Sequence, residues 1–593
     1  MSAVGAKSRS FWRAMYPGIL LVISFALSSC GSLPSASAAA STTPVPETGP
    51  IHVTILNTYP KIKTAVVRVM ETNETDTLDQ GALVLTSCVQ GQHISVWSPG
   101  HFISTILCSG TSPIEYPVTL EAFNAADNPN YLWVDADIRA SPTLNCARCH
   151  SNTLLGLNEY AEWNLDGHSR AFTSQYFLTT YMGTDLNRNP GQETFWSISG
   201  NGRRIRLPPD PTRPYYGPGY NLDYPNESGN CIYCHIPAGA VTMQQVGSLT
   251  SLINSSWGSR TNAPSEGVTC DVCHKVTDVF LGQDRLPFVE RPGVLSFSFV
   301  RLSSGPQFAI GPRPDQATFS TEIKQTCSPI FSKSEFCAPC HYGKFSDIEI
   351  YGSYREWLDS PYSQPLNFRS CQDCHMPSPK EIGNTSLSER SACSEENLEF
   401  RDFNHNMMKY GLDPVNNSRT IPLMVTKAAQ ISVDEVSISE GQIKFRVMVL
   451  NTGAGHKFPT DSPLRHLILL VDAKDENGNS LTQVGGQMIP KLGDSDYVGY
   501  AGQIYANVLK DRDTNVVPTI AYWNPVVPAW QGSDTRLVPG VPVYSEYSFV
   551  APSDGSATIT VRLIYRNVFY DIAHQKGLLP VDIEAVRTQL TVP

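Results

Sequence analysis

Hydrophobic and polar residues alternate in two parts of the chain, near its beginning and near its end. Residues 51–130 contain short apolar runs, such as 93–97, separated by glycines and prolines, and this pattern predicts a small β-sandwich. Within residues 418–593, the segments 443–449 and 559–565 alternate apolar with polar side chains, which is typical of strands with one buried face. We therefore expect the C-terminal part to form an immunoglobulin-like β-sandwich.

The part between them has little periodicity. Residues 131–417 are rich in proline, glycine and asparagine, and the segment 158–170 is one of the few that predict a helix. The expected fold class is therefore multidomain, with an irregular, sparsely helical core flanked by two β-sandwiches.

The N-terminus has the features of an export signal. Basic residues precede an apolar stretch at 18–27, which is too short to span a membrane but is typical of a signal peptide. The sequence at 27–30 resembles the cleavage site of bacterial lipoproteins, so we expect a signal peptide over 1–29, an acylated Cys30 and a Ser/Ala/Pro-rich tether over 30–50. The alternative is plain secretion with an incidental Cys30. The expected location is the outer face of a bacterial membrane, in the periplasm or at the cell surface.

Composition narrows the class of protein further. The net charge is −11 and only 17% of the residues are charged. A nucleic-acid-binding protein would carry clusters of lysine and arginine, so the negative charge argues against one. Fifteen cysteines in an exported chain indicate cofactor attachment or disulfides.

Ten of these cysteines lie in a Cys-x-x-Cys-His motif that occurs five times, far more often than composition would produce by chance. We refer to these copies as the first to fifth motifs. They are Cys146–Cys149–His150, Cys231–Cys234–His235, Cys270–Cys273–His274, Cys337–Cys340–His341 and Cys371–Cys374–His375.

This spacing is typical of c-type haem attachment, in which both thiols bond to the haem and the adjoining histidine binds the iron. Zinc is the main alternative, but a zinc site does not explain a histidine after every cysteine pair. We therefore expect five covalently attached haem c groups in residues 131–417. All five motifs lie within residues 146–375, which is too short to build a separate core around each haem, so we expect the haems to share one core. The short intervals between motifs predict that the second motif lies near the third and the fourth near the fifth.

Four cysteines remain besides Cys30. An even number in an exported protein suggests two disulfides. The pairs Cys88–Cys108 and Cys327–Cys393 keep both partners within one predicted domain. Other pairings, or four unpaired buried thiols, stay open.

At the segment 162–168 the chain resembles multihaem cytochromes of the cytochrome c-552/4 type, which are associated with hydroxylamine oxidoreductase. The segments 267–274 and 371–377 also resemble that family, and the resemblance covers roughly residues 140–470. The N-terminal β-rich part weakly resembles carboxypeptidase-regulatory-like domains.

The resemblance implies a second, distal histidine ligand for three of the five irons. These are His168 after a Glu-Trp helix, His405 after the last motif, and His456 in a Gly-His-Lys-Phe-Pro segment. A second Glu-Trp segment has Tyr362 where the first has His168. Two irons are therefore left with a methionine ligand or an open position.

Two functions are compatible with these features. The favoured one is an electron carrier without catalytic residues, exchanging electrons with other cytochromes or quinol-linked membrane complexes, in an oligomeric state that stays open. The alternative is a reductase of a small nitrogen oxyanion or hydroxylamine at a five-coordinate haem. Lys344, Arg355 and Tyr362, between the fourth and fifth motifs, are the best candidates for handling protons or an anion there.

Overall fold

The computed structural model describes most of the chain from residue 50 onward. Outside the described residues are 1–49, 58–60, 73, 78–82, 110–113, 138–144, 152–157, 243–248, 258, 304–306, 313–322, 378–403, 408–409, 412–420 and 554. The predicted signal peptide, Cys30, the tether up to residue 49 and Cys393 therefore lie outside them. Within the part of the chain that is described, no helix has both the length and the apolar character needed to cross a membrane.

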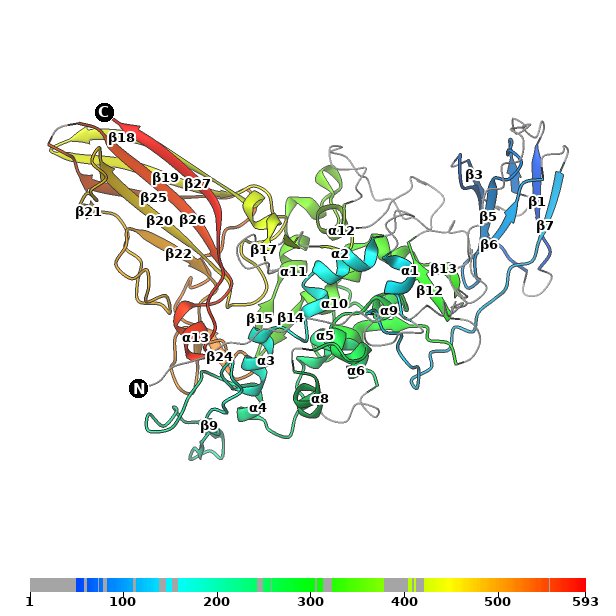
Figure 1. The fold of residues 1–593 in the computed structure, drawn as a ribbon, viewed down its shortest axis with the longest axis horizontal. Coiled ribbons are helices and arrows are strands. Elements are labelled where there is room, and N and C mark those ends of the chain that lie inside the picture. The colour runs from blue at the N-terminus through cyan, green and yellow to red at the C-terminus, as the bar shows by residue number, and fades with distance from the viewer. Residues whose placement is uncertain are drawn as a thin grey trace, which may run out of the picture.

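The described residues form an elongated molecule with β-structure at both ends (Figure 1). The N-terminal strands, in blue, occupy one end, and the C-terminal strands, in yellow to red, occupy the other. The short helices that carry the five motifs lie between them.

The N-terminal strands form two sheets, with orders β4-β1-β7 and β3-β2-β5-β6. Strand β1 pairs with β7 in parallel and with β4 antiparallel. Aliphatic side chains from both sheets pack into one cluster, because alternate residues of each strand face the same side. The strands are β1 Ile51–Ile55, β2 Val66–Val69, β3 Thr75–Thr77, β4 Leu83–Leu85, β5 His93–Trp97, β6 Ser104–Leu107 and β7 Ile114–Val118.

Cys88 and Cys108 form a disulfide within this β-structure, with an S–S distance of 2.03 Å. The bond joins the segment before β5 to the residue after β6, and both cysteines belong to the buried cluster. Cys327 is also disulfide-bonded, and its predicted partner Cys393 lies outside the described residues.

The middle part consists of short helices and two-stranded sheets, as its lack of periodicity predicts. No described helix there exceeds 8 residues. The helices are α1 Ala147–His150, α2 Glu159–Leu165, α3 Gln175–Met182, α4 Tyr220–Asp223, α5 Ile232–His235, α6 Pro237–Ala240, α8 Leu249–Ser256, α9 Cys270–Cys273, α10 Ala338–His341, α11 Ser353–Leu358 and α12 Cys371–His375. The strands are β8 Trp196–Ile198, β9 Arg204–Arg206, β10 Val276–Val279, β11 Phe297–Phe299, β12 Gln307–Gly311, β13 Ile323–Cys327, β14 Gly343–Phe345, β15 Ile348–Tyr351, β16 Tyr410–Gly411 and β17 Ile421–Pro422.

The C-terminal strands form two four-stranded sheets, with orders β18-β19-β25-β21 and β22-β20-β26-β27. The predicted strands at 443–449 and 559–565 are confirmed, since they lie within β19 and β26. The long strands are β18 Ala429–Ser439, β19 Gln442–Asn451, β20 His466–Asp475, β25 Pro542–Val550, β26 Ala557–Arg566 and β27 Asp582–Val592. The shorter elements are β21 Gln483–Gly485, β22 Gly502–Ala506, β23 Leu509–Asp511, β24 Val526–Pro528 and the helix α13 Tyr570–Gln575.

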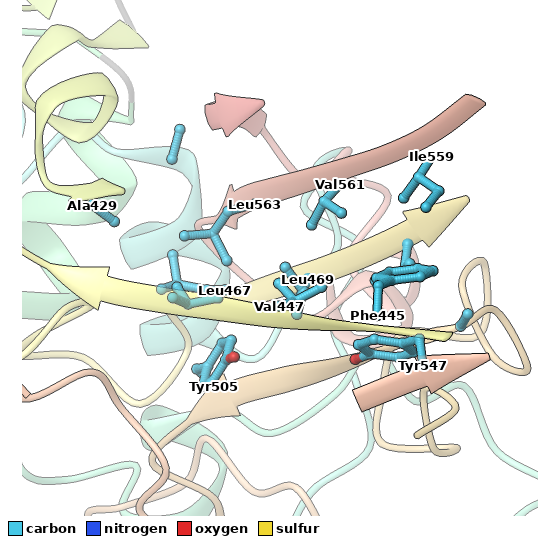
Figure 2. Close-up of a cluster of buried hydrophobic side chains, with 14 of the residues drawn as sticks. Ala429, Phe445, Val447, Leu467, Leu469, Tyr505, Tyr547, Ile559, Val561 and Leu563 are labelled. Atoms are coloured by element: carbon cyan, nitrogen blue, oxygen red, sulfur yellow. The ribbon is translucent and has the colours of Figure 1, made fainter. Parts of the chain in front are cut away.

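A core of aliphatic and aromatic side chains lies between these two sheets (Figure 2). Phe445 and Val447 of β19 pack in the same cluster as Leu469 of β20 and Val561 of β26. All four side chains are buried, so the alternation in the sequence marks the residues that face the opposite sheet.

Polar contacts attach both β-rich ends to the middle part. The Trp97 indole donates a hydrogen bond to the Thr326 hydroxyl at 3.1 Å. At the other end, the Lys576 ammonium lies 3.0–3.1 Å from the carbonyl oxygens of Thr179, Tyr216 and Pro218. The five motifs are therefore held between two β-structures that contact them directly.

Candidate haem sites

Each Cys-x-x-Cys-His motif coincides with a helix of about one turn. The motif helices are α1, α5, α9, α10 and α12. A single turn places two cysteines three residues apart on the same face, as bonding to one porphyrin requires. Nine of the ten motif cysteines are not disulfide-bonded. Cys149 is disulfide-bonded, so haem attachment at the first motif requires that this bond be open.

Cysteines from different motifs lie side by side. Hydrogen bonds between thiols join Cys146 to Cys270 and Cys337 to Cys371. The first motif therefore adjoins the third, and the fourth adjoins the fifth. The closeness of the fourth and fifth was predicted from their short interval and is confirmed.

The cysteines of the second and third motifs make their thiol contacts with other motifs. Cys234 of the second motif hydrogen-bonds Cys340 of the fourth, whereas the third motif has its thiol contact with the first. Tyr233 of the second motif and Val272 of the third nevertheless pack in one hydrophobic cluster, which agrees with the predicted closeness of these two motifs. Tertiary packing, rather than distance along the chain, sets which thiols are in contact.

Three motif histidines each face one of the histidines implied as distal ligands. The ring centroids of His341 and His168 are 6.1 Å apart, those of His274 and His405 6.4 Å, and those of His375 and His456 6.2 Å. A metal–nitrogen bond of about 2 Å on each side of one ion, plus half a ring on each side, gives a separation of about 6 Å. The three pairs therefore fit an iron held between two imidazoles.

The Nδ1 atoms of the motif histidines have partners of their own. Backbone carbonyl oxygens of Ala171, Ile310 and Met407 lie 2.6, 2.8 and 3.0 Å from the Nδ1 atoms of His235, His274 and His375. Contacts of this kind fix the ring orientation and leave Nε2 for the metal. Burial lowers the pKa of both His274 and His375 to about 4 and of His235 below its usual range, so these rings are neutral, as metal binding requires.

Carboxylates hold both rings of the pair His168–His341. The Nδ1 of His168 lies 2.6 Å from Asp166, and that of His341 lies 3.0 Å from Asp461. Burial alone would lower the pKa of His168, but the charge and hydrogen bond of Asp166 outweigh it and raise the pKa. A carboxylate on Nδ1 makes the opposite nitrogen a stronger donor to iron.

The motif histidines of the first and second motifs, His150 and His235, have no facing histidine in the described structure, although Nδ1 of His150 lies 3.3 Å from the carboxylate of Glu159. All thirteen histidines of the chain lie in the described residues, so the count is complete. The five histidines outside the motifs and the three pairs lie in the β-rich ends, as the sequence predicts: His52, His93, His101, His466 and His574. His466, for example, is fully buried, contacts Asp494 at 2.8 Å and stacks on Phe569. No histidine of this chain therefore faces His150 or His235 as in the three pairs.

A pocket adjoins the second motif. Cys231, Cys234 and His235 line it together with Tyr342, Lys344 and Tyr351. It is bordered by both thiols and the imidazole that a haem would need. The residues of the second motif therefore fit a haem.

The three residues considered for proton or anion handling do not form one group. Lys344 lines the cavity of the second motif and hydrogen-bonds the Tyr342 phenol. Arg355 instead pairs with Asp359 at 2.9 Å on an exposed surface, and Tyr362 packs in the cluster around Trp357. Of the three, Lys344 lines the pocket at the second motif; Tyr342, which also lines it, was not singled out from the sequence.

Comparison with known proteins gives few matches. No protein-family model matches the chain, and no curated protein matches it significantly. One solved structure, a penta-heme cytochrome c552 from Thermochromatium tepidum, covers 75% of this chain and 97% of its own, with 17% identity and a TM-score of 0.48. A structural-genomics target covers 28% of this chain and 90% of its own, with 9% identity and a TM-score of 0.12. At these TM-scores, the assignment of the haem sites rests on the residues described above.

Proposed function

We propose that the protein is an exported, membrane-anchored pentahaem c-type cytochrome that transfers electrons between other redox proteins. The observation that carries the proposal is the set of three histidine pairs, each joining a Cys-x-x-Cys-His motif to a histidine from elsewhere in the chain. Haem c supplies one-electron chemistry when bound, and two imidazole ligands leave its iron no open position for a substrate.

The contacts between motifs support a continuous path. Thiol contacts connect the first motif to the third, the second to the fourth and the fourth to the fifth. Between the third and fourth motifs, Cys273 lies close enough to Cys337 to influence its pKa. The attachment sites of all five haems would thus form one connected array rather than separate centres.

The role of this chain's own residues is to hold the array and set its properties. Buried imidazoles, their Nδ1 partners and the carboxylates of Asp166 and Asp461 determine ligand strength at each iron. The net charge of −11 favours docking with basic partners. We take these to be cytochromes or quinol-linked membrane complexes reached from a lipid anchor at Cys30.

The mass of the mature protein tests the haem content. Covalent attachment at five motifs predicts a mass that exceeds the polypeptide by about five haems, since thioethers survive denaturation. Replacing both cysteines of one motif by alanine should remove one haem. A protein that contains zinc and no haem would overturn the proposal. The anchor is tested separately: Cys30→Ala should release the protein from membranes, and unchanged retention would argue against acylation.

A second candidate function is favoured by one specific observation. His235 has no facing histidine, and the cavity at its motif is lined by Lys344 and Tyr342, which can donate protons or hydrogen bonds to a small anion. This arrangement suits reduction of a small nitrogen oxyanion or hydroxylamine at the second haem. Binding of nitrite or cyanide to the oxidised holoprotein, followed by its absorption spectrum, tests it: no spectral change would remove this candidate.

A further inference from the structure

The chain contains two copies of one short structural unit. Residues 159–169 and 353–363 each begin with a helix, α2 or α11, whose fourth and fifth residues are Glu-Trp. Each segment ends at a serine that follows the helix. The serine hydroxyls make the same contacts: Ser169 donates to the carbonyl oxygens of Asn164 and Asp166, and Ser363 to those of Leu358 and Ser360. The two segments therefore have the same local structure.

Each unit contacts a haem motif through its tryptophan. The Trp163 indole donates to the carbonyl oxygen of Val268 at 2.8 Å, and the Trp357 indole donates to that of Arg369 at the same distance. Val268 lies two residues before Cys270, and Arg369 lies two residues before Cys371. The first unit thus contacts the residues just before the third motif, and the second unit contacts those just before the fifth.

Each unit also contacts, through its glutamate, the loop that carries the facing histidine of that same motif. Glu162 accepts a hydrogen bond from the backbone N–H of His405 at 2.8 Å. Glu356 accepts one from the backbone N–H of Lys457, next to His456, at 3.1 Å, and another from the Thr460 hydroxyl at 2.6 Å. His405 faces His274 of the third motif, and His456 faces His375 of the fifth.

We propose that Glu162 and Glu356 are positioning residues that hold the distal histidines of the third and fifth haems. Each Glu-Trp helix then acts as a clamp, since its tryptophan fixes the motif and its glutamate fixes the opposing loop. The inference rests on the proposed function in one respect, because it takes His405 and His456 to be iron ligands.

The surroundings of Glu356 show why a carboxylate is needed there. Glu356 is buried, and the guanidinium of Arg536 lies 2.8 Å from its second oxygen. Arg536 also pairs with Asp534, which in turn binds the Lys457 ammonium at 2.8 Å. The carboxylate is therefore fixed from two sides, and hydrogen bonds from a loop to a fixed, charged acceptor are the strong kind.

The test compares alanine and glutamine at position 356 in the haem-loaded protein by low-temperature EPR. Glu356→Ala removes the oxygen that accepts both hydrogen bonds from the His456 loop, so a high-spin signal from one haem should appear at the expense of one low-spin signal. Glu356→Gln keeps an acceptor oxygen and should retain most of the low-spin signal. Asp359→Ala is the matched control, because Asp359 caps the same helix but pairs only with exposed Arg355 in the described contacts, and it should match wild type.

The variant His456→Ala tests whether His456 is an iron ligand, independently of the positioning role of Glu356. If it leaves every haem low-spin, His456 is not a ligand and the proposed assignment fails. If it produces a high-spin haem whereas Glu356→Ala matches wild type, the ligand assignment stands and the positioning role is overturned. The pair Glu162→Ala and His405→Ala gives the same comparison for the third haem.

If the Glu356→Ala protein does not incorporate haem, the variant Thr460→Val tests the positioning role instead. It removes one of the two hydrogen bonds that Glu356 receives from the loop and leaves its pairing with Arg536 in place. A raised high-spin fraction supports the positioning role, and an unchanged spectrum overturns it.

Discussion

The imidazole rings of His168 and His341 face each other with their centroids 6.1 Å apart, although the two residues are far apart in the sequence. His168 begins the 3-10 turn His168–Arg170 that follows the first motif, whereas His341 ends the fourth. The histidine nearest the first motif in sequence therefore faces the fourth motif, and under the proposed function it would bind the fourth haem. A haem held in this way would link two segments of the middle part that are far apart in the sequence.

This relationship predicts the outcome of replacing His168. His168→Ala should convert one low-spin haem to high-spin, because a buried iron loses a strong imidazole ligand. The affected haem should be the fourth, so the new signal should be absent when the fourth motif's cysteines are also replaced. The control is His574→Ala, since His574 makes an edge-on ring contact with Tyr570 in α13, in the C-terminal β-rich end. A high-spin signal that survives loss of the fourth haem would contradict the pairing.

Tyr362 occupies the position of His168 in the second Glu-Trp unit. A β-carbon at Gly455 would lie 3.3 Å from its ring, so Tyr362 packs against the loop that precedes His456. A phenol is a poorer iron ligand than the imidazole that His168 provides at the matching position. Tyr362→Phe should therefore leave the EPR and absorption spectra almost unchanged; a change of spin state would show that the phenol reaches an iron.

We predict that ionisation of Glu266 makes the free energy of unfolding depend on pH. Its carboxylate is fully buried and accepts hydrogen bonds from the backbone N–H groups of Ala136 and Asp137. Burial raises its pKa to about 7. The folded state thus holds this proton more tightly than the unfolded state, so the stabilising contribution is complete below about pH 4.5 and is lost as the pH rises through about 7.

The variant Glu266→Gln isolates this effect, because an amide does not titrate. The unfolding free energy of wild type relative to Glu266→Gln should fall by up to about 3 kcal/mol between pH 4 and pH 8. Denaturant unfolding at the two pH values measures it. A difference that is constant or that rises with pH would contradict a raised pKa.

We predict that Lys576 contributes to the unfolding free energy by attaching the C-terminal β-structure to the middle part. Its ammonium is buried and donates to three backbone carbonyl oxygens of the middle part. Lys576→Met leaves these carbonyls without that donor, at about 1 kcal/mol each and about 3 kcal/mol in all. The matched control is Lys474→Met, because Lys474 is half-exposed and lies 3.6 Å from Asp472. Equal unfolding free energies for both variants would show that the buried contact contributes little.

Local patterns in the sequence predicted local structure well. The alternation at 443–449 marks β19 because each buried residue faces the opposite sheet, and each motif forms its own short helix. The histidines implied by the family resemblance, His168, His405 and His456, all face motif histidines. A short pattern carries this information because it depends only on neighbouring residues.

Relationships between distant segments were not predictable in the same way. The sequence did not reveal that His168 faces the fourth motif, because that depends on how the first and fourth motifs pack. The sequence also did not reveal that Lys344 lines the pocket at the second motif, whereas Arg355 pairs with Asp359 on α11. The roles of Glu162 and Glu356 were missed as well, although the repeated Glu-Trp pair was a signal for both.

Low-temperature EPR of the fully oxidised holoprotein, with the spins of each signal integrated, tests the central claim most directly. The three histidine pairs predict three low-spin ferric haems with two imidazole ligands, because the other five histidines outside the motifs lie in the β-rich ends of the described structure. The remaining two haems should give signals of another kind, either high-spin or with a ligand other than histidine. Fewer than three low-spin haems of the bis-imidazole type, or five of them, would contradict the account.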